Sequence, residues 1–103
     1  MPVSRRVAIL GGVRIPFCRN NTAYFGIGNL GLSTIVLGGL VEKFQLQGQV
    51  LGEVAMGAVL KHSSDFNLAR EATLSSGLSP HTPGLTLQRA CGTSLDSIIT
   101  IGN

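Results

Sequence analysis

Hydrophobic residues along the chain fall into short apolar runs that alternate with stripes of helical spacing. Residues 6–10 (RVAIL) are rich in branched apolar side chains and are followed by two glycines, which predicts a strand buried on both faces. Residues 11–28 are rich in glycine, proline and asparagine and predict a long loop. Apolar positions then recur every three or four residues over 30–44, which predicts a mostly buried helix. The glycine pair at 38–39 is costly inside a helix, so we expect another backbone to approach closely there.

A second strand and a second helix follow. Residues 53–60 (EVAMGAVL) form an apolar run that predicts a strand. Asp65 or Asn67 has the side chain to cap a helix that continues to about Ser76. Gly77 then stands where a helix ends in a left-handed residue.

The last third of the chain repeats the same order. Residues 85–90 (LTLQRA) alternate like a third strand, and a helical stripe begins directly after Cys91. The predicted order is therefore strand, helix, strand, helix, strand, helix, the βαβαβα pattern of a layered α/β sheet with helices on its faces. Because the final helical pattern is still running at Asn103, we expect residues 1–103 to be part of a larger domain, truncated in its last helix.

Composition adds that this chain is poor in charge. Of its 103 residues 44% are hydrophobic and only 13% charged, about half the usual share, which excludes a disordered segment. We expect other copies or other segments to cover much of its surface. The net charge of +3 comes from basic residues spread singly along the chain, so no nucleic-acid patch is predicted. The most apolar stretch, 30–41, is too short to span a membrane, and a reducing, intracellular context fits best.

A glycine pattern at the start of the first helix resembles a nucleotide-binding motif. Gly26, Gly28 and Gly31 have the GxGxxG spacing. The dinucleotide fingerprint needs these glycines directly after the first strand and an acidic residue at the end of the second strand. Here a long loop intervenes, and the second strand ends near a lysine and a histidine. We interpret the glycines as flexible residues at a helix start.

Cys91 is the candidate nucleophile, because it lies where a strand gives way to a helix. At a helix N-terminus the free backbone N–H groups and the positive dipole end favour the reactive thiolate, and the same N–H groups can serve a developing oxyanion. Cys18 lies in a loop without such a setting and is interpreted as structural. The two cysteines differ in surroundings, and no zinc-type spacing is present, so neither a disulfide nor a metal site is predicted.

Four segments resemble one known family. The motif QRACGTS, the lead-in PGLTLQ, the segment MGAVLKHSSDFNLAR and the early LGGVRIPF are similar to the N-terminal part of the thiolases, the acyl-CoA C-acyltransferases. The similarity covers nearly the whole chain and is closest to the acetyl-CoA acetyltransferase and 3-ketoacyl-CoA thiolase branches. It implies a thiolase-like fold and assigns residues 1–103 to the N-terminal part of the thiolase N-terminal domain. It also implies that Cys91 forms an acyl thioester and passes the acyl group to coenzyme A.

The resemblance also shows what this sequence lacks. The other catalytic segments of the family, Asn-Glu-Ala-Phe, Gly-His-Pro and Cys-x-Gly, lie downstream of the nucleophile and do not occur here. His62 and His81 do not match the histidine segment of the family, and we expect both at the surface or in turns. Arg14 and Arg70 stand at family positions that we expect to tie loops or a subunit contact. The chain alone is therefore expected to carry only the nucleophile part of the site.

Two other readings stay open at this stage. A ketoacyl-synthase type of condensing enzyme shares the fold and a cysteine at a helix start, and a non-catalytic structural fragment is compatible with the missing motifs. On the thiolase reading the partners are acyl-CoA and coenzyme A, the latter as substrate, with no cofactor and no metal. The resemblance further implies fatty acid metabolism, a homo-oligomer for the full-length protein and a cytoplasmic location.

Overall fold

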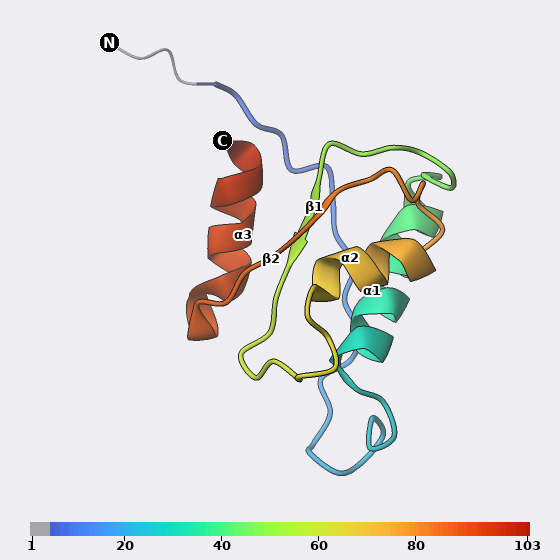
Figure 1. Ribbon diagram of the computed structural model, residues 1–103, viewed down its shortest axis with the longest axis vertical. Helices are drawn as coiled ribbons and strands as arrows, with labels where there is room; N and C mark the ends of the chain where they lie inside the picture. Colours follow the sequence, from blue (N-terminus) through green and yellow to red (C-terminus); the bar gives the residue numbers. More distant parts are fainter. Residues whose placement is uncertain (1–4) are drawn as a thin grey trace.

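A short parallel sheet lies between helices in the computed structural model, which describes residues 5–103 (Figure 1). The two strands run in the same direction, with Val54 opposite Gly84 and Met56 opposite Thr86. A helix connects them, as parallel strands require, and the predicted α/β class is confirmed. The elements in chain order are α1 (Asn29–Lys43), β1 (Val54–Met56), α2 (Leu68–Ser75), β2 (Gly84–Thr86), the 3₁₀ turn η1 (Ala90–Gly92) and α3 (Thr93–Gly102).

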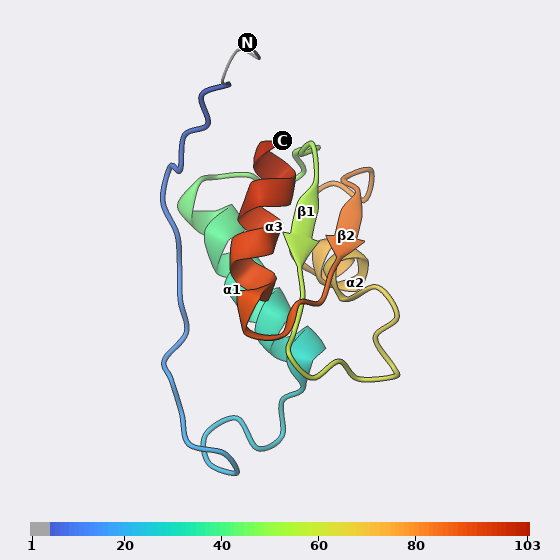
Figure 2. The same cartoon turned by 90° about the vertical axis from the view of Figure 1, so that its left-hand side faces the viewer.

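Helices cover both faces of this sheet. In Figures 1 and 2, α3 lies on one side of the strands and α2 on the other, with α1 packed against α2. The core forms where α1, α2 and β1 meet, because each turns an apolar stripe toward the others. Its buried side chains are Leu37, Val41, Val54, Ala72 and Leu78.

The strand predicted over residues 6–10 is wrong. This segment has no regular secondary structure, and its apolar side chains face outward, with Leu10 82% exposed. It runs past the ends of two helices, where Arg5 Nη2 donates to the carbonyl of Asn103 and Lys43 Nζ donates to the carbonyl of Gly12. A strand needs a neighbouring backbone to pair with, and β-branched composition does not supply one. Within the described chain the sheet has only β1 and β2.

The long loop predicted over 11–28 is confirmed, since it contains turns but no helix or strand. The Tyr24 hydroxyl donates to the carbonyl of Pro16 across 2.7 Å. Arg14 acts locally, donating to the carbonyl of Ile15 and lying over the Phe17 ring. The loop is thus held by its own residues, and it delivers the chain to the start of α1.

Helix α1 starts and ends within two residues of the prediction but is less buried than expected. Only Leu37 and Val41 are fully buried, while Ile35 is 54% exposed. The expected close backbone approach at Gly38 and Gly39 is also wrong: a Cβ at either glycine would meet no atom within 4 Å among residues 5–103. The two glycines therefore weaken the helix without a packing gain.

We expect Gly38→Ala to stabilise the chain. Alanine has a higher helix propensity than glycine by about 0.5–1 kcal/mol, and the new methyl group meets open space. The measurement is the midpoint of urea unfolding, followed by far-ultraviolet circular dichroism, which reports helix content. A lower unfolding midpoint for Gly38→Ala would contradict the open surroundings of this position.

Helix α2 is capped by Asn67, which decides between the two predicted caps. Asn67 Oδ1 accepts the backbone N–H of Arg70 at 3.0 Å, and its Nδ2 donates to the carbonyl of Gly84 at 3.1 Å. The predicted end is also confirmed, because Ser76 is the C-cap and Gly77 follows in the left-handed region with φ +96°. Asp65 is buried instead in the preceding turn, where it accepts the Ser64 hydroxyl.

Gly84→Ala is expected to destabilise the chain, because α2 approaches β2 closely at this glycine. An added Cβ would lie 2.6 Å from the backbone nitrogen of Arg70 and 2.9 Å from the carbonyl carbon of Ala69. Backbone cannot move aside as a flexible side chain does, so we expect a loss of about 1–3 kcal/mol. The same unfolding experiment checks this, with Gly38→Ala as the control that adds the same methyl group. Equal midpoints for Gly84→Ala and the wild type would contradict the packing.

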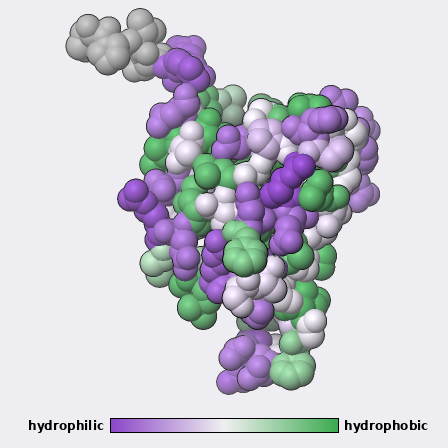
Figure 3. Space-filling model, viewed as in Figure 1, coloured by the Kyte–Doolittle hydropathy of each residue, from purple (hydrophilic) through white to green (hydrophobic). Residues whose placement is uncertain are grey.

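The other predicted strands and the last helix are confirmed in kind but differ in length. β1 and β2 each have three residues, fewer than the runs 53–60 and 85–90. Helix α3 begins at Thr93 and leaves several large apolar side chains exposed. These side chains are Leu95, Ile98, Ile99 and Ile101. In Figure 3, green hydrophobic atoms lie among purple and white ones in the region where Figure 1 draws α3.

Candidate active site

Cys91 lies in the 3₁₀ turn η1, between β2 and α3, and its side chain is a free, exposed thiol. The sequence placed it at the start of the helix, whereas α3 itself begins two residues later, with Gly92 as its N-cap. Because η1 leads directly into α3, the thiol still precedes the first turn of that helix. The position suits a reactive thiol, since it is accessible and near the positive end of a helix dipole.

The carboxyl ends of both strands reach this turn. The backbone N–H of Leu87, just after β2, donates to the carbonyl of Met56 at the end of β1. Gln88 Nε2 donates to the carbonyl of Val59, which follows β1. Cys91 therefore lies just beyond the edge where parallel strands end, the edge at which α/β proteins commonly place their sites.

The backbone of the turn has one unusual residue directly before the cysteine. Ala90 has φ +44°, in the left-handed region that residues with a Cβ rarely adopt. The N–H of Gly92 donates to the carbonyl of Arg89 at 2.8 Å, and the N–H of Thr93 donates to the carbonyl of Ala90. In the described part of the chain, no backbone carbonyl accepts the N–H of Cys91. That N–H is available beside the thiol.

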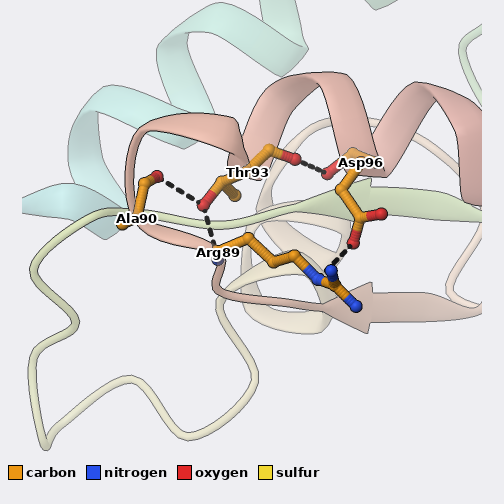
Figure 4. A network of polar contacts seen from close by, with 5 residues as sticks. Arg89, Ala90, Thr93 and Asp96 are labelled. Atoms are coloured by element: carbon orange, nitrogen blue, oxygen red, sulfur yellow. Dashed lines mark hydrogen bonds and ion pairs between the residues drawn. The ribbon is translucent and has the colours of Figure 1, made fainter.

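Polar side chains brace the turn (Figure 4). The Thr93 hydroxyl accepts the N–H of Arg89 and donates to the carbonyl of Ala90, both at 2.8 Å. Arg89 Nε and Asp96 Oδ2 form an ion pair at 3.2 Å. With the Arg89 side chain 72% exposed, this pair contributes at most about 1 kcal/mol. Neither Thr93 nor Asp96 is a candidate site residue on sequence grounds, although the hydroxyl of Thr93, two residues after the motif cysteine, is a signal that could have pointed to it.

Cys18 is remote from this turn along the chain and lies in the loop 11–28. It is exposed and so is not part of the hydrophobic core, and its interpretation as structural stays a prediction. It neighbours Tyr24, whose pKa is raised above its usual value by desolvation and by interaction with the Cys18 thiol. Because both thiols are exposed, the reactivity of Cys18 is an internal reference for the reactivity of Cys91.

Both histidines are exposed, as predicted. His81 lies in the turn before β2. His62 belongs to a local network in which its Nδ1 lies 2.7 Å from the Ser64 hydroxyl, which in turn donates to Asp65 Oδ1. This network borders a hollow of about 640 Å³ at the amino end of α1, whose lining also includes Lys61 but not Cys91.

The glycines of the GxGxxG pattern surround the same helix start. Gly28 is the N-cap of α1, and Gly31 lies within its first turn. Gly28 and Gly31 line the hollow, which is bounded by side chains from the segment after β1 rather than by a strand end. The interpretation as residues of a helix start is confirmed.

The family arginine Arg70 ties a loop, as expected. Its Nη1 donates to the carbonyls of Pro80 at 2.6 Å and Thr82 at 2.8 Å, fixing the turn that precedes β2. Among residues 5–103, no group of three or more His, Cys, Asp or Glu side chains is arranged to hold a metal ion. In the same residues, every helix is too short or too polar to cross a membrane.

Comparisons with known proteins agree on one family. A profile described as "Thiolase, N-terminal domain" matches residues 7–103. The 3-ketoacyl-CoA thiolase of Cronobacter sakazakii is 34% identical over 96 residues, and that of Escherichia coli strain 55989 is 33% identical over the same length. Each match covers 93% of this chain but 22% of the relative, so the chain spans about a fifth of these proteins.

A solved structure has the same arrangement of elements. The crystal structure of the Bacillus anthracis acetyl-CoA acetyltransferase superposes with a TM-score of 0.70 at 25% identity. The superposition covers 78% of this chain and 20% of that one.

Proposed function

This chain belongs to the thiolase family, whose N-terminal domain it matches over residues 7–103, and from this we propose that Cys91 is its acyl-accepting nucleophile. The proposed activity is acyl transfer between a 3-ketoacyl-CoA and coenzyme A, the chemistry for which its relatives are named. The observation that carries the proposal is the exposed thiol of Cys91 in the turn that joins β2 to α3. Coenzyme A enters as substrate, and no cofactor is needed.

The proposed chemistry has two transfers. The Cys91 thiolate attacks the 3-keto carbon, the new S–C bond forms, and the bond between carbons 2 and 3 breaks. The electron pair of that bond leaves with acetyl-CoA, which takes up a proton. The thiolate of coenzyme A then attacks the acyl thioester and releases Cys91, so each step exchanges one bond at the acyl carbon.

The turn offers one group to stabilise the charge that develops on the attacked carbonyl oxygen. The N–H of Cys91 has no backbone acceptor among residues 5–103 and lies beside the thiol. Oxyanion donors of this kind are typically backbone N–H groups at the start of a helix. The groups that move protons are expected from the downstream family segments rather than from His62 or His81, which both lie elsewhere at the surface.

The remaining partners follow from the same proposal. The exposed apolar side chains of α3 support the expectation that further chain or a second copy covers this surface. The proposed thiol nucleophile has to stay reduced to react, so the proposal requires a reducing compartment such as the cytoplasm.

Acylation of Cys91 tests the proposed function directly. The protein, expressed in full from its gene, is incubated with acetyl-CoA and digested, and its peptides are weighed by mass spectrometry. We expect one added acetyl group on the peptide that contains Cys91 and none on the peptide that contains Cys18. The protein's intact mass, measured first, gives the length of chain in the assay.

The Cys18→Ser variant is the matched control, because it removes the other exposed thiol and should leave acylation unchanged. Acetyl groups found equally on both cysteines would indicate non-specific chemistry. A folded protein whose Cys91 stays unmodified would favour the non-catalytic alternative and contradict the proposal.

A further inference from the structure

The left-handed conformation of Ala90 is a feature that its own sequence does not explain. This conformation costs a residue with a Cβ about 1–2 kcal/mol, and it persists only where the surroundings hold it. Because Ala90 directly precedes Cys91, its φ angle sets the direction in which the chain enters the cysteine. Whatever holds Ala90 therefore also holds the thiol.

The Thr93 hydroxyl makes two of the hydrogen bonds that hold this turn, beside the backbone bonds donated by Gly92 and Thr93. It accepts a hydrogen bond from the N–H of Arg89, on one side of Ala90, and donates one to the carbonyl of Ala90, on the other. One hydroxyl thus links the N–H of the residue before Ala90 to the peptide group between Ala90 and Cys91. Thr93 is only 7% exposed, so water does not readily replace these bonds.

The rest of Thr93 is fixed from two further directions. Its methyl group packs against Gly57, just after β1, where an added Cβ would lie 2.7 Å from Thr93 Cγ2. Its carbonyl accepts the hydroxyl of Ser97 at 2.9 Å within α3. The segment after β1, the turn and α3 therefore meet at this residue.

We propose that Thr93 is a positioning residue for Cys91, its hydroxyl holding Ala90 in the left-handed conformation and so placing the thiol at the start of α3. This inference rests on the proposed function for its catalytic meaning. Thr93 acts through Ala90 and needs no contact with substrate. Its loss should therefore lower kcat of acyl transfer and leave KM unchanged.

The test compares Thr93→Val with Thr93→Ser in the protein expressed in full. Valine keeps the shape and the one methyl group of threonine but has a second methyl in place of the hydroxyl, whereas serine keeps the hydroxyl and lacks the methyl group. The first measurement is the rate of alkylation of Cys91 by iodoacetamide as a function of pH, read by peptide mass mapping. We expect Thr93→Val to slow it by about five- to tenfold, the size of one net hydrogen bond, and Thr93→Ser to restore it.

Two controls separate positioning from general damage. Cys18 in the same sample should react at an unchanged rate. Thr100→Val makes the same substitution at an exposed position of α3 and should leave Cys91 unaffected. If Thr93→Val does not fold, Thr93→Ser decides, because a folded Thr93→Ser protein with slow Cys91 alkylation would assign the effect to packing and overturn the proposal.

The two proposals fail in different ways. An unchanged Cys91 alkylation rate and unchanged kcat in folded Thr93→Val would overturn the positioning role and leave acylation of Cys91 intact. A slowed alkylation in a protein that never acquires an acetyl group would support the positioning of the thiol while contradicting the proposed function.

Discussion

Replacing Cys91 by serine is expected to abolish acyl transfer. The hydroxyl is almost entirely protonated at neutral pH, and the described contacts give it no adjacent base, so it stays a poor nucleophile. We expect thiolysis of acetoacetyl-CoA to fall by roughly 10⁴-fold or more, as when other covalent nucleophiles are removed. The measurement is the disappearance of acetoacetyl-CoA in the presence of coenzyme A, with the protein expressed in full from its gene.

Cys18→Ser is the control for this loss, since it makes the same substitution at the other exposed cysteine. It should retain wild-type turnover. Because Cys91 is exposed and lies outside the core, both variants should unfold at the wild-type urea concentration. Turnover retained by Cys91→Ser would show that another group accepts the acyl chain.

Leu68→Ala should cause a large loss of stability. Leu68 is the first residue of α2, is 2% exposed, and is among the largest fully buried side chains of residues 5–103. Truncating such a side chain costs about 2–5 kcal/mol, through lost burial and the cavity left behind. A small domain is stabilised by only about 5–15 kcal/mol, so the variant should unfold at a much lower urea concentration or fail to fold.

Leu74→Ala on the same helix is the matched control. Leu74 is 52% exposed, so the same substitution removes far less buried area and should cost well under half as much. The measurement is the midpoint of urea unfolding of each variant, followed by circular dichroism. Equal losses would contradict the burial of Leu68 and the exposure of Leu74.

The sequence predicted correctly those features that depend on hydrogen bonds and backbone angles of residues close together in the chain. Asn67 caps α2 by bonding the N–H of Arg70, three residues on, and Gly77 ends it with a positive φ. Both are short-range events that residue type predicts. The choice of Asn67 over Asp65 was left to the structure, because Asn67 also reaches the carbonyl of Gly84, 17 residues away.

Long-range packing explains the errors. The run 6–10 has strand composition, yet strand formation depends on a partner backbone that composition does not report. Two glycines, one in α1 and one in β2, also have surroundings that the sequence does not report. Gly38 meets open space, whereas Gly84 lies against the backbone of α2, and nothing in the residues beside them distinguishes the two.

For the candidate site, the sequence by itself supplied the proposed nucleophile and the motif around it, and it determined the family to which the chain belongs. It did so because these depend on residue identity and on order along the chain. Only the tertiary structure decided that Cys91 sits in a 3₁₀ turn, that Ala90 before it is left-handed, and that Thr93 braces both. Those features depend on where β1, β2 and α3 meet, since the contact of Thr93 with Gly57 joins residues far apart in sequence.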